Sequence, residues 1–344
     1  MRVLIAPLQW GLGHATRCVP IIKNYLEQNH EVIIASDGLA LQLLQDEFPT
    51  LPFVELPSYN IEYKNKNLMW GVIFQAFKLL KTVYTENKIM SYLIQSQHID
   101  QIISDNRLGC YSQKVKSIYI THQLNLPIQN FFVRFFGNKV HYFFIKKYAE
   151  CWIPDIETPE KNISGALSHP IPKTLRTRVK YIGTLSRFKY SEETKIYSCI
   201  IVLSGPEPQR TIFENILVSQ INAHWRELFY NKCDKICFVR GTEILNPNLN
   251  FLAQNIEVHN LLPSQILNKK ILQSHFYIGR SGYTTLMDVI ALQKLAILVP
   301  TPGQFEQEYL ADFHALNPRF YTVSQNDFEI KKAYKSLISR AIQQ

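Results

Sequence analysis

Short runs of apolar residues, many of them β-branched, alternate with segments of helical periodicity along the whole chain. Runs of this length between polar turns are typical of strands buried on both faces of a parallel sheet. The predicted strands of the first half lie at residues 3–6, 32–35, 53–56, 101–104, 117–120 and 151–153. Those of the second half lie at residues 199–203, 236–239, 256–258, 276–278 and 295–299. With helices between them, the two series predict two doubly wound α/β domains.

The boundary between the two series falls within residues 161–198. From Lys161 to Lys189 this segment holds seven basic residues and no acidic one. A chain of 344 residues is long enough for about two domains of roughly 150 residues each. We therefore expect an N-terminal domain over residues 1–185 and a C-terminal domain over residues 186–326.

The chain has an excess of positive charge and scattered cysteines. Lys and Arg number 37 against 28 Asp and Glu, a net charge of +9, which favours an anionic partner such as a nucleotide, a membrane surface or nucleic acid. The cysteine spacing matches no metal site, so reduced thiols are expected. The first apolar run is too short for a signal peptide, and no apolar window approaches the ~18 residues of a membrane span. The sequence predicts a cytoplasmic protein, soluble or peripheral to the membrane.

A glycine-containing turn follows the first predicted strand, at the strand end where ligands of open α/β sheets bind. Gly11 and Gly13 lead into a helix that begins near His14 and runs to about Gln28. Glycines let the backbone approach a ligand closely, and a helix start presents N–H groups to an anion. The alternative is an ordinary tight turn, because the spacing departs from the dinucleotide-binding fingerprint.

A second turn of this kind follows the first strand of the second series. Ser204 and Gly205 begin it, and Arg210 is placed to reach an anion at the start of the next helix. The competing interpretation is that Pro206 and Pro208 only start a helix.

The strongest signal is a polar loop and helix after the predicted strand 276–278, followed by a second polar helix start. The residues concerned are Arg280, Ser281, Gly282, Thr284 and Asp288, and then Gln304, Gln307 and Glu308. A carboxylate one turn into a helix can accept hydrogen bonds from both hydroxyls of a ribose, while loop N–H groups face phosphate. The side chains of Gln304, Gln307 and Glu308 are donors and acceptors suited to sugar hydroxyls. The alternative is that all these side chains cap and solvate their helices.

Residues 279–311 resemble the donor-site signature of glycosyltransferase family 28, whose best known member transfers GlcNAc from UDP-GlcNAc to lipid I in peptidoglycan synthesis. Residues 11–14 are similar to that family's first glycine-rich loop, and residues 183–187 to its interdomain segment. The resemblance implies a GT-B fold, with two Rossmann-like domains facing a cleft, the nucleotide-sugar on the C-terminal domain and the acceptor on the N-terminal one. It also implies that the last helix, within residues 327–344, packs back on the N-terminal domain.

The same resemblance implies roles for individual residues. Asp288 would hold the ribose hydroxyls. The other donor contacts would be Ser281, Gly282 and Arg187 at the diphosphate, the backbone near Leu262 at the base, and Gln307 with Glu308 at the sugar. Asp288 stands where the family usually has Glu, and a Pro-containing segment replaces the second glycine-rich loop. Glu308 stands where the lipid I transferase has Gln, so the sugar need not be GlcNAc.

The expected reaction is an inverting transfer without a metal or other cofactor. No D-x-D sequence occurs to bridge a metal to a diphosphate, so Arg187, Arg280 or helix dipoles must stabilise the leaving UDP. Inversion needs a general base beside the acceptor hydroxyl. Three residues that follow strands of the N-terminal domain are candidates, and the sequence does not choose among them: His14, His122 and Asp105.

Two stretches in which aromatic and basic residues alternate suggest the acceptor. They lie at residues 68–93 and 131–148, and such mixtures suit the interface of an anionic membrane. The alternative for either stretch is an aromatic core face with solvated lysines. Aromatic and basic residues also occur together in single-strand nucleic-acid sites, but no nucleic-acid-binding motif is present.

The function predicted from the sequence is a glycosyltransferase that moves a sugar from a UDP-sugar to a lipid-linked or cell-envelope glycan. One alternative is a nucleotide-sugar epimerase of the same fold. Another is a non-catalytic subunit that binds a nucleotide-sugar or recruits a membrane partner.

Overall fold

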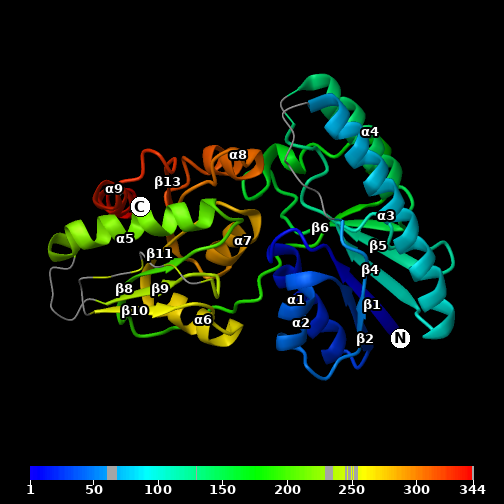
Figure 1. Ribbon diagram of the computed structural model, residues 1–344, viewed down its shortest axis with the longest axis horizontal. Helices are drawn as coiled ribbons and strands as arrows, with labels where there is room; N and C mark the ends of the chain where they lie inside the picture. Colours follow the sequence, from blue (N-terminus) through cyan, green and yellow to red (C-terminus); the bar gives the residue numbers. More distant parts are fainter. Residues whose placement is uncertain are drawn as a thin grey trace. The chain divides into compact units, whose positions relative to one another are not determined.

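The computed structural model describes residues 1–59, 68–128, 130–228, 235–244, 246, 249, 251 and 255–342. The chain divides into two compact units, Met1–Leu185 and Ser186–Gln344. Each unit has its own parallel sheet with helices on both faces (Figure 1). None of the helices within these described ranges is long and apolar enough to cross a membrane.

The described part of the first unit is built on a seven-stranded parallel sheet in the order β3-β2-β1-β4-β5-β6-β7. The strands are β1 (Arg2–Pro7), β2 (Glu31–Ser36), β3 (Phe53–Glu55), β4 (Gln101–Asp105), β5 (Lys116–Ile120), β6 (Glu150–Ile153) and β7 (Val179–Tyr181). The helices are α1 (Gly13–Glu27), α2 (Gly38–Glu47), α3 (Leu68–Ser96) and α4 (Phe131–Ile145), with 3-10 turns at Gly165–Leu167 and Lys173–Leu175.

Alternating side chains of β1 explain why this sheet is covered on both faces. Val3 and Ile5 pack in the cluster formed with α1 and α2, whereas Leu4 and Ala6 pack with Met90 on α3. Figure 1 accordingly shows α1 and α2 on one side of the sheet and α3 and α4 on the other. A strand buried on both faces reads as a continuous apolar run, which is the pattern that predicted it.

The second unit repeats this plan with the strand order β10-β9-β8-β11-β12-β13 in its described residues. The strands are β8 (Tyr197–Val202), β9 (Ile236–Val239), β10 (Ile256–His259), β11 (Ser274–Gly279), β12 (Leu295–Leu298) and β13 (Phe320–Thr322). The helices are α5 (Gln209–Leu228), α6 (Ser264–Leu272), α7 (Tyr283–Ala291), α8 (Phe305–Phe313) and α9 (Ile330–Ile342). The predicted doubly wound architecture is therefore confirmed. The two strands that the apolar pattern missed, β7 and β13, are three-residue edge strands.

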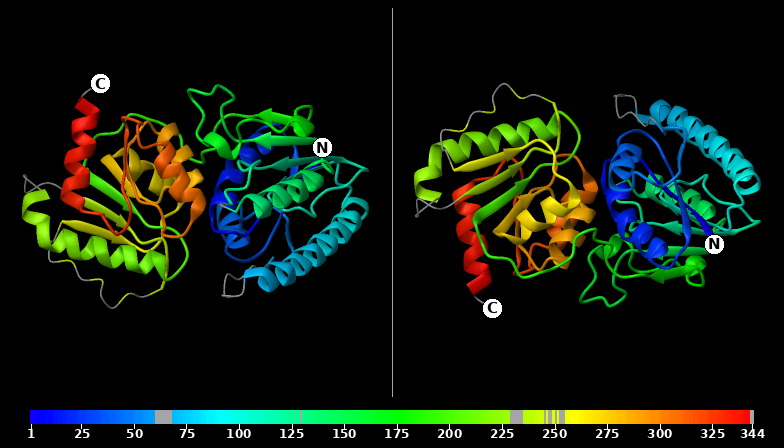
Figure 2. Two further views of the ribbon diagram at one scale, coloured as in Figure 1. Left: turned by 90° about the horizontal axis from the view of Figure 1, so that it is seen from above. Right: turned by 90° about the horizontal axis from the view of Figure 1, so that it is seen from below.

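The last helix packs in the core of the second unit. Ile330, Ala333 and Leu337 of α9 belong to the apolar core of the second unit, where they join Phe213 of α5 and Phe276 of β11. Figure 2 shows the red α9 beside the yellow-green α5, on the same flank of that unit's sheet. The apolar stripe of α9 is therefore buried within the second unit. That residues 327–344 pack back on the N-terminal domain stays a prediction of the resemblance.

Candidate functional site

The first unit brings its candidate catalytic residues together where the direction of strand addition reverses. β1 and β4 are neighbours in the sheet, with Pro7 paired to Asp105, and β5 adjoins β4. Gly11 turns the chain after β1 with φ +75°, a conformation that favours glycine, and α1 then starts at Gly13. Ligands of open α/β sheets bind at such a switch point.

His14, Asp105 and His122 form one buried cluster around Arg17. His14 Nδ1 lies 2.8 Å from Asp105 Oδ1 and 2.8 Å from Nη2 of Arg17. The guanidinium of Arg17 makes a bidentate ion pair with Asp105 and donates to His122 Nδ1 at 2.8 Å. The carboxylate therefore holds an imidazole on one side and a guanidinium on the other.

The charges of this cluster follow from burial and ion pairing. Burial opposes ionisation of Asp105, but Arg17 and His14 outweigh it and hold the pKa of Asp105 well below its ordinary value. Burial, assisted by the charge of Arg17, lowers the pKa of His14. His14 is consequently a neutral imidazole near pH 7 beside an ionised carboxylate.

The two histidines differ in what their second ring nitrogen can do. If His14 donates from Nδ1 to Asp105, its Nε2 keeps a lone pair, and no described residue hydrogen-bonds to that nitrogen. His122 has partners at both nitrogens, because Nδ1 accepts from Arg17 and Nε2 lies 3.3 Å from the Gln123 amide. In the tautomer that donates from Nδ1 to Asp105, His14 Nε2 can accept a proton, and in the other tautomer Nδ1 accepts from Arg17.

Arg17 is the functional-site residue that sequence reasoning missed. It is 1% exposed although it carries a charge. It lies one turn after His14, among the buried apolar positions Cys18, Val19 and Ile22 of α1. A charged residue on the apolar face of a helix needs a buried partner, and this mismatch was the available signal.

A second buried ion cluster at the same edge of the sheet fixes α3. Arg107, just after β4, donates to Asp37 Oδ1 and to Glu86 Oε1 of α3, both at 2.6 Å. Tyr59 donates to Glu86 Oε2 at 2.6 Å. The single guanidinium of Arg107 thus contacts two carboxylates, and these hydrogen bonds hold α3 on the sheet.

The second unit has its switch point between β8 and β11, which run side by side. Gly205 follows β8 with φ +105°, and a Cβ there would lie 3.6 Å from Thr301 Oγ1. Ser281 follows β11 and donates from Oγ to the carbonyl of Gln307 at 2.8 Å. Gly282 caps α7 without a side-chain hydrogen bond. Three loops of the predicted donor site thus meet at one edge of this sheet.

The buried guanidinium of Arg280 donates hydrogen bonds to several of the loops at this edge. It is 1% exposed and donates to the carbonyl of Gln209 (2.8 Å), the carbonyl of Pro300 (3.2 Å) and Oε1 of Gln325 (2.7 Å). Burial lowers its pKa to about 10, so it stays charged at neutral pH. No carboxylate of the described residues pairs with it, and the positive charge is therefore available to the loops above.

Gln307 and Glu308 shape the loop before α8. Gln307 accepts from the N–H of Thr301 at 2.9 Å and donates to Gln304 Oε1 at 2.6 Å. Glu308 accepts from the N–H of Gly303 at 2.9 Å. These are the capping contacts that the sequence left as an alternative to sugar binding, and a sugar would have to share or replace them.

Arg210 has a different role from the one expected. Its guanidinium is buried between Glu207, three residues before it, and Glu214, one turn after it. With two carboxylates as neighbours it is not available to an anion, and that expectation is corrected. Ser204 is exposed, while Leu262 and Thr284 are half-buried at the same edge of the sheet.

Asp288 and Arg187 lie near each other although they are far apart in the sequence of the second unit. Ser186 Oγ donates to Asp288 Oδ1 at 2.6 Å, and Arg187 donates to Ser264 Oγ at the start of α6 at 3.1 Å. Burial raises the pKa of Asp288 to about 6, although Arg187 and the Ser186 hydrogen bond oppose this. The predicted ribose ligand is thus a carboxylate near its titration point.

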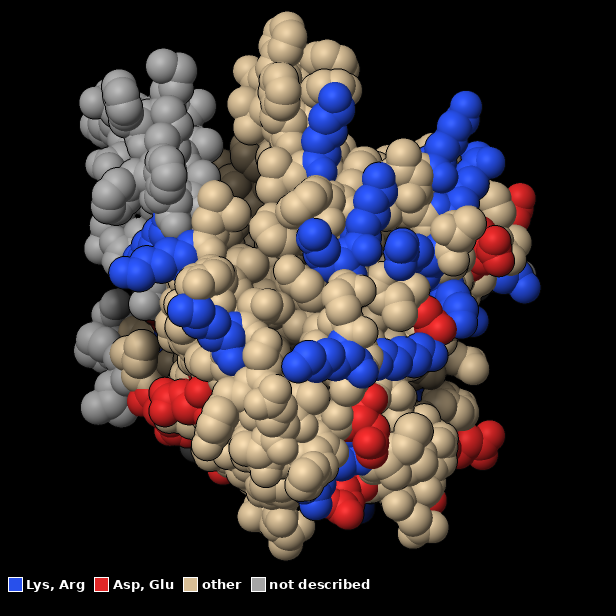
Figure 3. Space-filling view, turned by 90° about the vertical axis from the view of Figure 1, so that its right-hand side faces the viewer, with Lys and Arg blue, Asp and Glu red and all other residues tan. Residues whose placement is uncertain are grey.

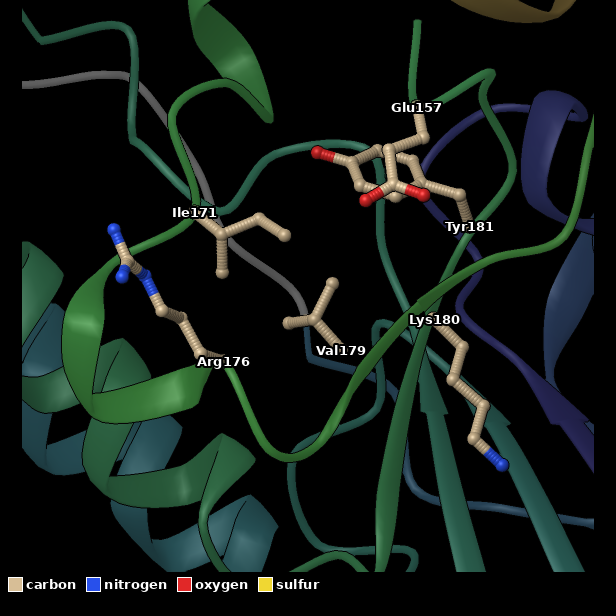
Figure 4. Close-up of a pocket in the computed structure, with 6 residues that line it drawn as sticks. All are labelled: Glu157, Ile171, Arg176, Val179, Lys180 and Tyr181. Carbon is tan, nitrogen blue, oxygen red and sulfur yellow. The ribbon is translucent and has the colours of Figure 1, made fainter.

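A hollow of 620 Å³ lies beside β7 in the first unit. It is lined by Glu157, Ile171, Arg176, Val179, Lys180 and Tyr181. Figure 4 shows Glu157 beside Tyr181, while Lys180 turns away and donates to Glu150 at 2.9 Å. Its polar groups do not converge, and none of them was a predicted site residue.

Comparison with known proteins agrees with this geometry. Residues 201–333 match the sequence model of the glycosyltransferase family 28 C-terminal domain, a range that includes the signature at 279–311. The chain is 23% identical over 331 residues to an uncharacterized glycosyltransferase of Methanosarcina acetivorans, covering 90% of this chain and 80% of that protein.

Solved structures share the fold of the whole chain. Spinosyn rhamnosyltransferase SpnG, complexed with thymidine diphosphate, has a TM-score of 0.64 at 13% identity, covering 100% of this chain and 95% of that one. MurG of Acinetobacter baumannii has a TM-score of 0.57 at 15% identity, covering 99% and 91%. The protein is a glycosyltransferase of the GT-B fold, and its second unit matches the C-terminal domain of family 28.

Proposed function

We propose that this glycosyltransferase moves a sugar from a UDP-sugar to a lipid-linked or cell-envelope glycan acceptor, with inversion and without a metal. The observation that carries the proposal is the grouping of Asp288, Arg187 and the unneutralised Arg280 in the unit that matches the family 28 domain. A carboxylate for a ribose diol and two cations for a diphosphate are what a nucleotide-sugar requires.

On the donor side, each group has a separate task. Asp288 accepts hydrogen bonds from the ribose hydroxyls, and the backbone near Leu262 meets the base. Ser281, Gly282 and the start of α7 face the diphosphate, while Arg187 and Arg280 stabilise the charge that develops on the leaving UDP. Gln304, Gln307 and Glu308 surround the sugar, for which GlcNAc is the first candidate to test.

On the acceptor side, the proposed base is His14. Its Nε2 takes the proton from the acceptor hydroxyl as the oxygen attacks the anomeric carbon. Asp105 then stabilises the imidazolium that forms. Arg17 keeps Asp105 ionised and fixed. One base on one side of the sugar gives a single displacement, and therefore inversion.

Replacing Asp288 by asparagine should weaken UDP binding by about 10- to 100-fold, because a hydrogen bond to a charged group contributes about 1.5–3 kcal/mol. Isothermal titration calorimetry measures this directly. The matched control is Asp312→Asn, since Asp312 is an exposed aspartate on α8 of the same unit. If Asp288→Asn folds and binds UDP as tightly as the wild type, the donor assignment is wrong.

Transfer should continue at an unchanged rate in excess EDTA. Arg187, Arg280 and the helix starts supply the positive charge that a metal provides in other transferases. UDP release, measured with and without the chelator, tests this. A rate that falls with EDTA and recovers with Mg²⁺ or Mn²⁺ would contradict a metal-free leaving-group site.

The proposed lipid-linked acceptor rests on the surface of the first unit formed by α4 and the described side chains of α3. On α4, the side chains of Phe131, Phe132, Phe136 and Phe143 are each more than half exposed. They are therefore not the core face that the sequence left open as an alternative. Of the stretch 68–93 that the sequence singled out, the side chains of residues 68–77 lie outside the described set.

Charge on this surface has one sign. Its basic residues are Lys78, Lys81, Lys88, Arg134, Lys139, Lys146 and Lys147. Between residues 78 and 149 the acidic residues are Glu86, Asp100 and Asp105. Glu86 and Asp105 are buried and ion-paired, and Asp100, exposed beyond the end of α3, accepts a hydrogen bond from the N–H of Arg2. Figure 3 shows Lys and Arg side chains among uncharged residues over the upper part of this face. We place the protein at the cytoplasmic face of an anionic membrane, where a lipid-linked acceptor would be presented.

A further inference from the structure

The linker residue Ser186 makes a hydrogen bond that no donor-site role accounts for. Its Oγ lies 2.6 Å from Asp288 Oδ1 and accepts a hydrogen bond from the N–H of Phe188 at 3.1 Å. Because the Phe188 N–H occupies an acceptor position of this hydroxyl, its hydrogen points at the carboxylate. One oxygen of Asp288 is thereby held in a fixed place by the first residue of the second unit.

The other oxygen of the same carboxylate has no such partner. Oδ2 of Asp288 makes no hydrogen bond to any residue in the described part of the chain, and Asp288 is half-buried. The charged or titratable groups that face the carboxylate are Arg187 from the linker and Tyr277 from β11. A carboxylate anchored at one oxygen and open at the other is arranged to receive a pair of hydroxyl donors.

We infer that Ser186 is a positioning residue for the donor, which holds Oδ1 of Asp288 so that the carboxylate stays ionised and presents Oδ2 to the ribose diol. This inference rests on the proposed function, because it takes Asp288 as the ribose ligand. Ser186 itself need not touch the nucleotide.

The effect of Ser186 on the ionisation of Asp288 can be measured. The hydroxyl donates a stronger hydrogen bond to an ionised carboxylate than to a protonated one, so it favours the ionised form. Burial already raises the pKa of Asp288 to about 6, and loss of this donor must raise it further. The diol preference of the site should therefore fade at a higher pH in Ser186→Ala than in the wild type.

The experiment compares the affinities of UDP and 2′,3′-dideoxy-UDP by calorimetry between about pH 5.5 and 8. Both nucleotides carry the same diphosphate, whose last ionisation lies near pH 6, so the ratio of their affinities cancels that titration. In the wild type the preference for UDP should fall as the pH drops through about 6. In Ser186→Ala it should be about 3- to 10-fold smaller at pH 7, with its midpoint at higher pH. Ser186→Thr, which keeps the hydroxyl, should restore both the size of the UDP preference and the pH of its midpoint.

Each outcome decides between the claims. A Ser186→Ala protein with the preference and midpoint of the wild type overturns the positioning role. Equal weakening of both nucleotides also overturns it, because that pattern reports a general distortion of the loop. If Asp288→Asn retains the UDP preference, or if the wild type has none, the ribose assignment fails and the inference fails with it.

Discussion

Replacing His14 by alanine should lower the rate of sugar transfer by about 10²- to 10⁴-fold, the range that a general base contributes. The affinity for UDP should stay unchanged, because the donor residues belong to the other unit of the chain. Asp105 keeps its ion pair with Arg17 in this variant, so the buried charges remain balanced and the fold should survive. Initial rates with saturating donor and calorimetric UDP affinity together test the assignment.

The pH dependence of the same reaction supplies an independent check. His14 must be neutral to accept a proton, and burial lowers its pKa from the ordinary value of 6.5. Activity should therefore persist as the pH falls below about 6.5, and decline only when His14 becomes protonated. An exposed histidine of the second unit, His275, provides the matched control His275→Ala. A His14→Ala protein with wild-type turnover would leave His122 and Asp105 as the remaining candidates.

The fold could be predicted from the sequence because strands buried on both faces leave a local signal. β1 and β8 are continuous apolar runs, and each lies at the centre of its sheet. The signal fails where burial is incomplete, as at the edge strands β7 and β13. Helix α9 shows the same limit, since its apolar stripe says that it packs on something but not on which unit.

The candidate site could be predicted only as separate pieces. His14, Asp105 and His122 lie far apart in the sequence, and they meet because β4 inserts beside β1. That pairing is a property of the whole sheet and has no local signature. The three candidate bases consequently lie in one buried cluster around Arg17.

The sequence also does not give the direction in which a side chain points. Arg210 and Arg280 both follow strand ends and are alike in sequence terms. Arg210 points at Glu207 and Glu214, whereas Arg280 points at loop carbonyls with no carboxylate. Spacing placed both arginines at the same edge of the sheet, but only the packing distinguishes a cation paired with carboxylates from one that has no carboxylate partner in the described residues.

Binding to anionic liposomes should fall by about 100- to 1,000-fold when Arg134, Lys139, Lys146 and Lys147 are replaced by serine, because each cation near an anionic surface contributes about 1 kcal/mol. Lys139 and Lys147 lie over the rings of Phe135 and Phe143 at 4.3 and 4.6 Å, so charge and aromatic surface would enter the headgroup region together. Wild-type binding should be stronger to anionic than to neutral vesicles. It should also weaken with salt, since screening limits the reach of the charges to ~8 Å at physiological ionic strength.

A charge-matched control separates this surface from the overall charge of the chain. Serine at the exposed positions Lys189, Lys269, Lys332 and Lys335 of the second unit removes the same four charges and should leave vesicle binding nearly unchanged. UDP affinity should survive the quadruple change on α4, because those side chains lie in the first unit. If the two quadruple variants lose vesicle binding equally, attraction is a property of the net charge of +9. If the wild type ignores anionic vesicles even at low salt, α4 does not meet a membrane and the acceptor is water-soluble.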